Sequence, residues 1–475
     1  MNAGLDAART ALADARAWLV GGALRDRELG RETADLDIVL DGDTAAAARA
    51  VARAGAPATC FALSEEFGSW RVASRAGDWQ LDLEPLRGSG IEQDLALRDF
   101  TINAIAEPLA GGELLDPLGG LEDVRARRLR MAGPRAFADD PLRVLRLARI
   151  AVELDFEVEA ESGRAAALGA AGLRAVAAER VFAELRRIVA ADRARRGLEL
   201  LEQFGASAIV LPEIEPMRGV AQNRFHHLDV HGHTLEVFDR TVELTRPGGP
   251  ERGGALERAI EPHAAAVTSL LAEPLADEMT RGEALRWGAL LHDAAKPLTR
   301  DVRAADGRVT FIGHDSRGAE LARAALARLR SSERLRAHVA ALVRHHLRLG
   351  FLVHEPQPLS RRTVFAYLRA CTPVEVDVTL LSIADRLATR GDRSEQAIEA
   401  HLRVAAGMLD DALRWRAEGP GDPLLRGDEL AGELGIATGP RVGRLLDALA
   451  EAQYAGELAT REQALAYARE AARSI

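Results

Sequence analysis

The feature that most constrains the fold is a pair of aspartates spaced two residues apart in the apolar run DLDIVL. On a β-strand, residues i and i+2 point to the same face, so Asp35 and Asp37 are predicted to hold two carboxylates side by side. Leu36 and Ile38 would then turn into a core. A second apolar run, AWLV at 17–20, precedes this segment and is also predicted to be a strand. The chain therefore needs a sheet with one buried face and one face that tolerates paired negative charge.

Two adjacent carboxylates repel each other unless a cation lies between them, and hard oxygen ligands suit Mg²⁺. Asp35 and Asp37 are therefore candidate Mg²⁺ ligands, in a site that substrate phosphates would complete. Gly21 and Gly22 stand where the first strand meets a predicted helix, and a glycine turn at a helix start exposes backbone N–H groups to an anion. Arg25, one turn into that helix, is placed to donate a charge-assisted bond to a phosphate oxygen.

A third carboxylate, Asp82, lies in the predicted strand WQLDLEPL and is a candidate to complete a metal-binding trio, although Glu84 shares its face. Taken singly, an Asp-x-Asp pair is often a solvated strand edge and a glycine pair is often an ordinary turn. The combination of strand, GGxxRD, helix and Asp-x-Asp strand is much more specific.

Length, charge and cysteine content limit the class of protein. The 475 residues predict two to four domains, and no apolar stretch of 18 residues suggests a membrane span. The net charge of −10 argues against a general nucleic-acid coat, but residues 125–196 hold 16 Arg against 10 Asp and Glu. That asymmetry fits a localised phosphate-binding face, with an ordinary Arg-rich helical surface as the alternative. Two cysteines give neither a disulfide framework nor a thiolate metal site, so we expect a cytoplasmic enzyme.

The hydrophobic period divides the chain into an α+β part and a longer helical part. Strands are predicted at 17–20, 36–40, 69–74 and 79–86, in a small mixed sheet with helices. Beyond residue 130 the period is helical throughout. Four segments are therefore expected: 1–130, 131–222, 223–395 and 396–475.

The stretch DDPLRVLRLARI predicts one amphipathic helix, with Asp139 as its N-cap and Pro141 in its first turn, where a missing N–H costs nothing. Without further context this would be an exposed basic helix. Three arginines recur along it at every third position: Arg143, Arg146 and Arg149.

Six motifs occur in one order along the first half of the chain. They are GGALRDRELG, DLDIVL, LRDFTINAIA, DPLGGLEDVRARRLR, DDPLRVLRLARI and ERVFAELRRIV. This order resembles the class II tRNA nucleotidyltransferase and bacterial poly(A) polymerase family. The resemblance covers about 18–220 closely, and the tail at 424–458 resembles that of CCA-adding members. It implies a polymerase-β-like nucleotidyltransferase head at 1–130, followed by a helical neck at 131–222 that selects the nucleotide and binds RNA.

The resemblance also implies metal-assisted nucleotidyl transfer. Mg²⁺ at the aspartate pair would lower the pKa of an RNA 3′-hydroxyl and neutralise charge on the α-phosphate, while a second ion would clamp the leaving pyrophosphate. Gly22 and Arg25 would hold the triphosphate. Arg98 would reach the phosphates and Asp99 the ribose hydroxyls, while Asn103 braces the loop or serves only its turn.

The same resemblance assigns Asp140 and Arg143 to reading the base of the incoming nucleotide. A carboxylate only accepts hydrogen bonds and a guanidinium only donates them. Cytosine and adenine each offer an amino donor beside a ring-nitrogen acceptor, whereas uracil and guanine present the reverse. This pair would therefore accept CTP and ATP, with Arg146 and Arg149 nearby on the triphosphate or as structural partners.

The histidines cluster in the segment 223–395, which contains HTLEV, LLHDAAKP and IADR. The adjacent His292 and Asp293 end an apolar helical run and place an imidazole and a carboxylate at one edge. A lone buried histidine is more often structural, but the flanking residues favour a metal. The order H…HD…D resembles the HD phosphohydrolase superfamily, an all-helical fold.

Carried over from that superfamily, four residues would bind a divalent metal that activates water: His233, His292, Asp293 and Asp385. His314 and His345 are candidates for a second metal. Since His227 and His231 crowd His233, the first ligand has alternatives. The last segment, 396–475, is expected to be a helical, tRNA-binding tail.

The leading hypothesis is a tRNA nucleotidyltransferase that adds C and A from CTP and ATP to the tRNA 3′ end, with an HD phosphohydrolase domain. A poly(A) polymerase shares the head motifs, as do CC-adding and A-adding enzymes. A different class is an HD phosphohydrolase whose head only binds RNA. The intact Asp-x-Asp, GGxxRD and DPLR motifs argue against that last class.

Overall fold

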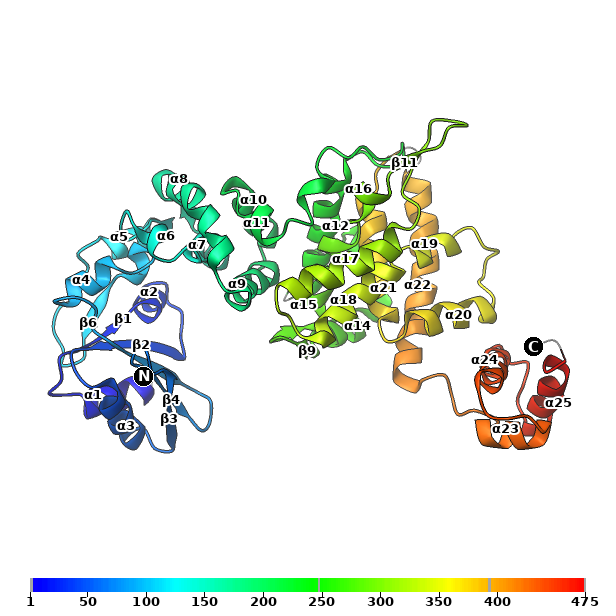
Figure 1. Ribbon diagram of the computed structural model, residues 1–475, viewed down its shortest axis with the longest axis horizontal. Helices are drawn as coiled ribbons and strands as arrows, with labels where there is room; N and C mark the ends of the chain where they lie inside the picture. Colours follow the sequence, from blue (N-terminus) through cyan, green and yellow to red (C-terminus); the bar gives the residue numbers. More distant parts are fainter. Residues whose placement is uncertain (1–2, 247, 392–393, 474–475) are drawn as a thin grey trace. The chain divides into compact units, whose positions relative to one another are not determined.

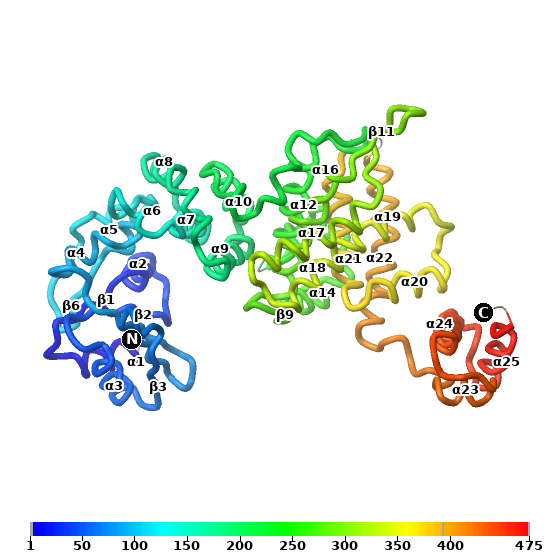
Figure 2. Tube along the Cα trace, viewed as in Figure 1, coloured from blue at the N-terminus to red at the C-terminus, as the bar shows by residue number. Residues whose placement is uncertain are grey.

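The computed structural model describes residues 3–246, 248–391 and 394–473 (Figures 1 and 2). Contacts along the chain define two compact units, Met1–Val210 and Leu211–Ile475. A mixed sheet with helices opens the chain and helices make up nearly all the rest, which confirms the predicted fold class. Within these ranges no helix combines the length and the apolar character that a membrane crossing needs.

The first unit is built on a six-stranded sheet of order β3-β4-β5-β2-β1-β6. Only β2 and β5 pair in parallel, and all other neighbours are antiparallel. The strands are β1 (Ala17–Val20), β2 (Asp35–Leu40), β3 (Ala58–Ser64), β4 (Ser69–Ser74), β5 (Gln80–Pro85) and β6 (Ala106–Pro108).

The sequence did not predict the two edge strands, β3 and β6. In β3 (ATCFALS), half-buried and exposed residues alternate, and the exposed ones include Phe61 and Leu63. Because apolar residues stand on both faces, the strand lacks the apolar-polar alternation that marks a half-buried strand. β6 is only three residues long.

Helices cover one face of the sheet and leave part of the other open. α1 (Ala3–Ala11) and α3 (Thr44–Ala54) pack on the first face over a core that includes Leu36, Ile38 and Leu81. On the second face a smaller cluster including Val20 and Val39 is buried with residues that surround α4 (Ile91–Ala96). The remainder of this second face, over β2, β5, β4 and β3, carries the polar side chains described below.

The motif DPLGGLEDVRARRLR builds the support of the loop that follows α4. α5 (Gly120–Arg125) packs against the short 3₁₀ helix η1 (Thr101–Asn103). Its Asp123 is fully buried and accepts hydrogen bonds from Thr101, Arg128 and Arg130. This carboxylate therefore has a structural role, since it joins Thr101 in the loop to two arginines that follow α5 in the chain.

The expected single helix at DDPLRVLRLARI is wrong in its start. α6 (Ala136–Asp139) ends at Asp139, Asp140 is extended, and α7 (Arg143–Leu154) begins only at Arg143. The physical reason is Pro141, because the residue before a proline is excluded from the α region by the proline ring. Asp139 is therefore not the N-cap. Its neighbour Asp140 instead accepts a hydrogen bond from the Leu142 N–H at 3.1 Å.

Short elements complete the first unit around α7, which packs against α9 and α10. They are α2 (Gly22–Glu28), β7 (Arg128–Leu129), β8 (Glu157–Val158), α8 (Ala160–Gly169), η2 (Ala170–Ala175), α9 (Ala178–Ala190), α10 (Ala194–Gln203) and α11 (Ser207–Val210).

The second unit is helical, with α12, α15, α18 and α21 packed on one another. The elements up to the long α22 are η3 (Glu215–Met217), α12 (Val230–Thr245), α13 (Ala255–Ile260), η4 (Glu261–His263), α14 (Ala264–Leu271), β9 (Pro274–Ala276), β10 (Met279–Thr280), α15 (Arg281–Leu291), α16 (Lys296–Thr299), β11 (Asp301–Val302), β12 (Val309–Thr310), α17 (His314–Arg328), α18 (Glu333–His345), α19 (Arg348–Leu352), α20 (Arg361–Cys371), α21 (Glu375–Ala388) and α22 (Ser394–Glu418).

Three further helices form a tail with its own apolar core: α23 (Gly427–Leu434), α24 (Pro440–Tyr454) and α25 (Arg461–Ala471). α24 begins at Pro440, whose missing N–H costs nothing in the first helical turn. The expected boundary between 395 and 396 falls in the first turn of α22, which packs against α21. The tail core thus begins further along the chain than the expected boundary.

Candidate functional site

Asp35 and Asp37 point to the same, open face of β2. Both are exposed at the surface, whereas Leu36 and Ile38 between them are buried in the core. Asp37 pairs in register with Val20 on β1, directly before the glycine turn. The strand alternation that the sequence predicted therefore sets both carboxylates on one face, with Asp37 beside the turn.

Gly21 allows the close approach of the two charged groups beside it. It has φ of +77°, and a Cβ placed there would lie 3.3 Å from both the Arg98 Nη1 and the Asp37 Oδ2. A side chain at this position would therefore be strained in its backbone and would crowd the space between guanidinium and carboxylate. The turn is a cradle formed by Gly21, Arg98 and Asp37.

A cavity of about 290 Å³ opens at this cradle. It contains seven of the nine residues expected to bind nucleotide, together with Asp37. The residues that line it are Gly21, Gly22, Arg25, Asp37, Arg98, Asp99, Asn103, Arg146, Arg149, Ile150, Glu153, Leu154 and Arg187.

A chain of hydrogen bonds runs along the cavity wall. Arg25 Nη1 donates to Asn103 Oδ1 at 2.7 Å, and Asn103 Nδ2 donates to Asp99 Oδ1 at 3.0 Å. Arg146 then donates from Nε and Nη2 to the other oxygen of Asp99, at 3.0 and 2.6 Å. Burial opposes ionisation of Asp99, but Arg146, Asn103 and the Phe100 N–H together lower its pKa to about 2. Asp99 is therefore an anion fixed by Arg146 on one oxygen and by Asn103 on the other.

Arg98 is held by a carboxylate that the sequence reading missed. The fully buried Asp94 accepts from Arg98 Nε and Nη2, at 3.2 and 3.1 Å, and also from Arg87 Nε at 3.0 Å. The signal was present, because Asp94 and Arg98 stand four residues apart at the end of a helical segment. This pairing orients the Arg98 guanidinium beside Asp37.

Asp37 lies among several charges. Desolvation by the surrounding protein raises the pKa of Asp37 to about 6; Arg98 lowers it, and the carboxylates of Glu84, Asp82 and Asp35 raise it further. A carboxylate that is costly to ionise among like charges fits a position where a cation binds, and its oxygens suit Mg²⁺. The donor set of Asp35 and Asp37 therefore fits the expected metal.

Asp82 lies next to Asp37 but is engaged by an arginine. It pairs in register with Asp37, as expected for a third carboxylate. Both of its oxygens, however, accept bonds of 2.7 Å from Arg71 Nε and Nη2. A metal at Asp37 would have to displace Arg71 to recruit Asp82. Asp35 is engaged as well, since its Oδ1 accepts a bond of 2.6 Å from Gln80 Nε2, and the trio stays a prediction.

The two expected base-reading residues lie outside the cavity lining. Arg143 donates to the carbonyls of Leu97 and Arg98, at 2.8 and 3.2 Å. Asp140 accepts from Arg180 Nη2 at 2.9 Å. Arg143 thus contacts the backbone of Arg98, the residue whose side chain forms part of the cradle.

Arg149 is a structural partner in this arrangement. It is buried and donates to Glu184 at 2.5 Å and to Glu153 at 2.7 Å. Both carboxylates neutralise it, so little of its charge is left for a ligand.

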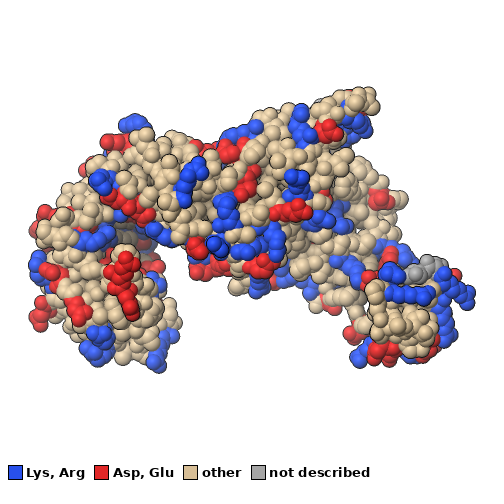
Figure 3. Space-filling view, viewed as in Figure 1, with Lys and Arg blue, Asp and Glu red and all other residues tan. Residues whose placement is uncertain are grey.

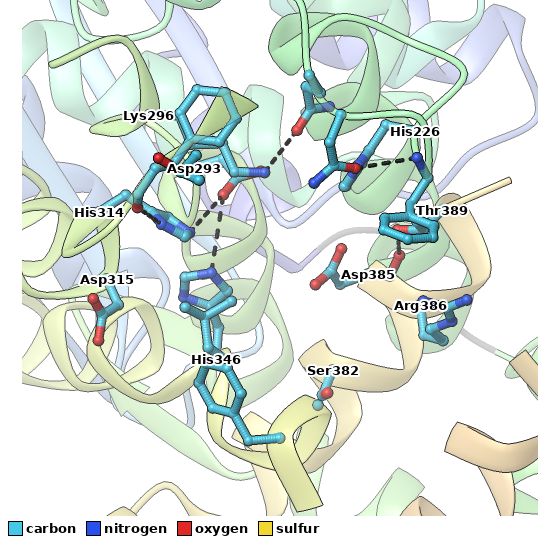
Figure 4. A pocket seen from close by; sticks show the side chains of 18 of the residues that line it. His226, Asp293, Lys296, His314, Asp315, His346, Ser382, Asp385, Arg386 and Thr389 are labelled. Carbon is cyan, nitrogen blue, oxygen red and sulfur yellow. Dashed lines mark hydrogen bonds and ion pairs between the residues drawn. The ribbon is translucent and has the colours of Figure 1, made fainter. Parts of the chain in front are cut away.

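The second unit contains a separate buried cluster of histidines and carboxylates (Figure 4). His233 on α12 and the adjacent His292 and Asp293 at the end of α15 are each about 1% exposed. His292 Nε2 lies 3.2 Å and His233 Nε2 3.8 Å from Asp293 Oδ2, and His233 Nε2 lies 3.0 Å from Asp385 Oδ1 on α21. The four expected HD-type ligands are thus brought together, although three different helices carry them.

His233 is the histidine of its segment that enters the cluster. His227 is exposed, and neither it nor His231 belongs to a ligand group with atoms close enough to share an ion among the described residues. His226, which the sequence reading did not single out, packs edge-on against His233 with ring centroids 4.9 Å apart and lines the adjoining cavity.

The expected second group needs one correction, because the second histidine is His346 and not His345. Asp293, His314 and His346 form a second group of ligand atoms, and Figure 4 shows their side chains turned toward one another. His345 instead accepts a hydrogen bond from Arg348 Nε at 2.9 Å. Neighbouring residues at a helix end point about 100° apart, so only one of the pair can face Asp293.

The hydrogen bonds of this cluster leave several of its ligand atoms free to bind a cation. Three histidines use Nδ1 on backbone carbonyls: His292 on Ala289, His314 on Phe311 and His346 on Val343. Such bonds place the proton on Nδ1 and leave Nε2 as a lone-pair donor. Among the described residues, Nε2 of His233, His292 and His314 and Oδ1 of Asp293 are buried without a hydrogen-bond partner. Buried polar atoms in this condition fit a bound divalent metal.

Lys296 is a further residue of this site that sequence reasoning passed over. Its Nζ lies 2.7 Å from Asp293 Oδ2 and donates to Gln222 Oε1 at 2.7 Å. Burial raises the pKa of Asp293, but the positive charge around it, that of Lys296 included, holds this pKa well below the usual range. The signal was available, because Lys296 is the single lysine of a chain whose other cations are arginines. A cavity of about 610 Å³ adjoins it, lined also by Asp385 and Arg386.

Comparison with known protein families matches three stretches of the chain. The head domain of poly(A) polymerase matches residues 17–130, the probable RNA- and SrmB-binding site of polymerase A matches 155–218, and the HD domain matches 263–390. Each contains part of the geometry described above.

Curated relatives cover almost the whole chain. An A-adding tRNA nucleotidyltransferase of Deinococcus radiodurans is 38% identical over 95% of this chain and 94% of its own length. A CC-adding tRNA nucleotidyltransferase of Thermus thermophilus is 35% identical over 95% and 92%. A multifunctional CCA protein of Nitrosococcus oceani is 32% identical over 82% and 85%.

Among solved structures, a CCA-adding enzyme in apo form covers 98% of this chain and 92% of its own, with a TM-score of 0.63 at 19% identity. At that identity the likeness shows the fold. The relatives show the family: this chain is a nucleotidyltransferase and belongs to the class II tRNA nucleotidyltransferase and poly(A) polymerase family, in the form that carries an HD domain.

Proposed function

We propose that this protein adds C and A from CTP and ATP to the 3′ end of tRNA, and so builds or repairs its CCA terminus. The observation that carries the proposal is the cradle at Gly21, where the Asp37 carboxylate and the Arg98 guanidinium meet at one end of a cavity. Transfer of a nucleotide from its triphosphate needs a carboxylate pair that can hold a metal ion, with oriented arginines beside it that can bind the phosphates.

The residues of the cavity have separable roles in this proposal. Arg98, oriented by Asp94, and Arg25, oriented by Asn103, would bind triphosphate oxygens. Asp99, kept ionised by Arg146, would accept from the ribose hydroxyls. Mg²⁺ held by Asp35 and Asp37 would supply the Lewis acidity that activates the RNA 3′-hydroxyl and neutralises the α-phosphate.

Asp140 and Arg143 remain the proposed readers of the base. Both are half-buried, and Arg143 is anchored to the carbonyl of the residue that forms the cradle. Leaving either partner unpaired against uracil or guanine costs about 1–3 kcal/mol, which corresponds to roughly tenfold to hundredfold selection. Figure 3 shows acidic and basic side chains interspersed over the face of the molecule that it draws.

A second candidate is an enzyme restricted to A or to CC. It is favoured by the two relatives that cover 95% of the chain, because one is named A-adding and the other CC-adding.

Purified protein should be incubated with three tRNA transcripts, which lack CCA, lack CA or lack only A, and with labelled CTP or ATP. Extension of all three to CCA supports the main proposal. Extension of only the last with ATP, or of only the first two with CTP, supports a restricted enzyme. Long A tails would indicate a poly(A) polymerase, and no extension would contradict nucleotidyl transfer.

For the second unit we propose a metal-dependent phosphohydrolase. Its support is the buried set of unpaired Nε2 and carboxylate atoms around Asp293, beside a cavity that contains Lys296. Asp35→Ala should abolish nucleotide incorporation and spare phosphate release from p-nitrophenyl phosphate with Mn²⁺ or Ni²⁺. Asp293→Ala should do the opposite. Loss of both activities in either variant would contradict two separate sites.

A further inference from the structure

Four residues form a transverse row across the open face of the head sheet. Register pairs Phe61 on β3 with Arg71 on β4, Arg71 with Asp82 on β5, and Asp82 with Asp37 on β2. Directly opposed residues in a sheet point to the same face, so all four side chains share the face that carries the aspartate pair. The nucleotide cavity ends at Asp37, and the other three residues extend away from it.

Arg71 is an oriented cation within this row. Its Nε and Nη2 are fixed on the two oxygens of Asp82 at 2.7 Å each, and its side chain is 30% exposed. Its Nη1 makes no hydrogen bond to any described residue. Because the guanidinium is already held by Asp82, the side chain loses little further conformational entropy when its Nη1 binds an anion.

Phe61 is an exposed aromatic at the end of the row. It is 48% exposed, and Leu63, two residues on and on the same face of β3, is 45% exposed. The pair presents an apolar platform to solvent beside an arginine. Aromatic platforms next to cations bind single-stranded nucleic acid, because bases stack on the ring while the cation contacts the backbone.

The direction from which the RNA must arrive matches this row. In nucleotidyl transfer the attacking and leaving oxygens lie roughly in line through the α-phosphorus. The cavity lies on the β1 side of Asp37 and is lined by Gly21, Gly22, Arg25 and Arg98. In the proposed function these residues bind the triphosphate, so the leaving pyrophosphate would lie on that side. The attacking 3′-hydroxyl must then enter from the β5 side. With strands about 4.8 Å apart, Arg71 lies about 10 Å and Phe61 about 14 Å from Asp37, a span that the last nucleotides of an RNA strand bridge.

We propose that Arg71 and Phe61 hold the 3′ end of the RNA primer. Arg71 contacts a backbone phosphate through Nη1, Phe61 stacks on one of the last bases, and Asp82 is a positioning residue that fixes Arg71. The inference rests on the proposed metal site at Asp35 and Asp37, because that site defines where the 3′-hydroxyl must be.

The test separates the affinity for RNA from that for nucleotide. With a tRNA transcript as primer, Phe61→Ala should raise the KM for tRNA about 5- to 100-fold, as expected for the loss of one stacked base, and leave the KM for CTP or ATP within twofold. Phe61→Trp should keep the wild-type KM. Arg71→Gln should raise the KM for tRNA and lower the slope of its logarithm against the logarithm of salt concentration by about 0.7, as for one lost phosphate contact.

Phe67→Ala is the matched control, because Phe67 is 68% exposed and lies in the turn between β3 and β4, outside the row. The proposal is overturned by an unchanged KM for tRNA in Phe61→Ala and Arg71→Gln, or by an equal effect of Phe67→Ala. Asp82→Asn should raise the KM for tRNA as Arg71→Gln does, but by a smaller factor. If Asp82→Asn instead lowers kcat and raises the Mg²⁺ concentration that activity requires, Asp82 is a metal ligand and its positioning role is refuted. Failure of the proposed function would look different, since the wild-type protein would then extend no tRNA.

Discussion

The Arg146 guanidinium donates two hydrogen bonds, of 3.0 and 2.6 Å, to a single oxygen of Asp99. The two residues stand 47 positions apart, one in the loop after α4 and the other on α7. Their contact ties the helical neck to the loop that carries Asn103 and faces Arg98. The proposed base-reading residues on the neck and the proposed ribose-binding residue on the loop are therefore positioned by one ion pair.

Removing this pair should cost both stability and nucleotide affinity. For Arg146→Gln we expect a loss of about 2 kcal/mol in unfolding free energy, since charge-assisted hydrogen bonds contribute about 1.5–3 kcal/mol and Arg146 is partly exposed. The KM for nucleotide should rise at least tenfold. Arg135→Gln is the control, because its pair with Asp139 is exposed and should contribute less than about 0.5 kcal/mol. Urea unfolding and steady-state kinetics check both, and equal stability losses in the two variants would contradict the assignment.

The same carboxylate predicts a pH dependence. Because the pKa of Asp99 falls to about 2 in the folded protein from an ordinary 3.8, the unfolded chain binds its proton more readily. Its contribution to stability is therefore complete above about pH 4 and decreases as the pH falls toward 2. The difference in unfolding free energy between wild type and Asp99→Asn should shrink from pH 5 to pH 3. A difference that grew on acidification would show that the carboxylate is not stabilised as an anion.

Local patterns were readable from the sequence in this region, and long-range ones were not. The side-by-side placement of Asp35 and Asp37 follows from the two-residue period of one strand. The break before α7 could also have been found, because Pro141 restricts Asp140. The Arg71–Asp82 pair depends on the register of two strands, and β3, which carries Phe61, has no clear alternation. The ion pair that occupies Asp82 could therefore not be read from the sequence, because tertiary contacts decide it, and the trio stays a prediction.

A tight contact beneath the loop gives a prediction on packing. A Cβ at Gly120, the first residue of α5, would lie 2.2 Å from the Thr101 carbonyl oxygen. Gly120→Ala should therefore displace η1 and cost about 3 kcal/mol in unfolding free energy. The loop that bears Asn103 would move with it, so kcat should fall as well. Gly443→Ala on α24, where an added Cβ meets nothing within 4 Å, should be neutral or stabilising by up to about 1 kcal/mol. Thermal unfolding of both variants measures these effects. An unchanged stability of Gly120→Ala would mean that α5 does not lie this close to Thr101.

The adjacent histidines at the end of α18 offer a matched pair for the second unit. His346 belongs with Asp293 and His314 to one group of ligand atoms, whereas His345 is bonded to Arg348 outside it. His346→Ala removes one Nε2 donor and leaves a buried carboxylate short of a partner, so it should weaken the binding of Mn²⁺ or Ni²⁺ at least tenfold and lower the metal retained after dialysis. His345→Ala should bind metal as the wild type does. Isothermal titration and metal analysis of the purified variants measure both quantities. Because both substitutions remove the same side chain one residue apart, a weaker affinity in His345→Ala, or an unchanged one in His346→Ala, would mean that Asp293 does not share a cation with this helix end.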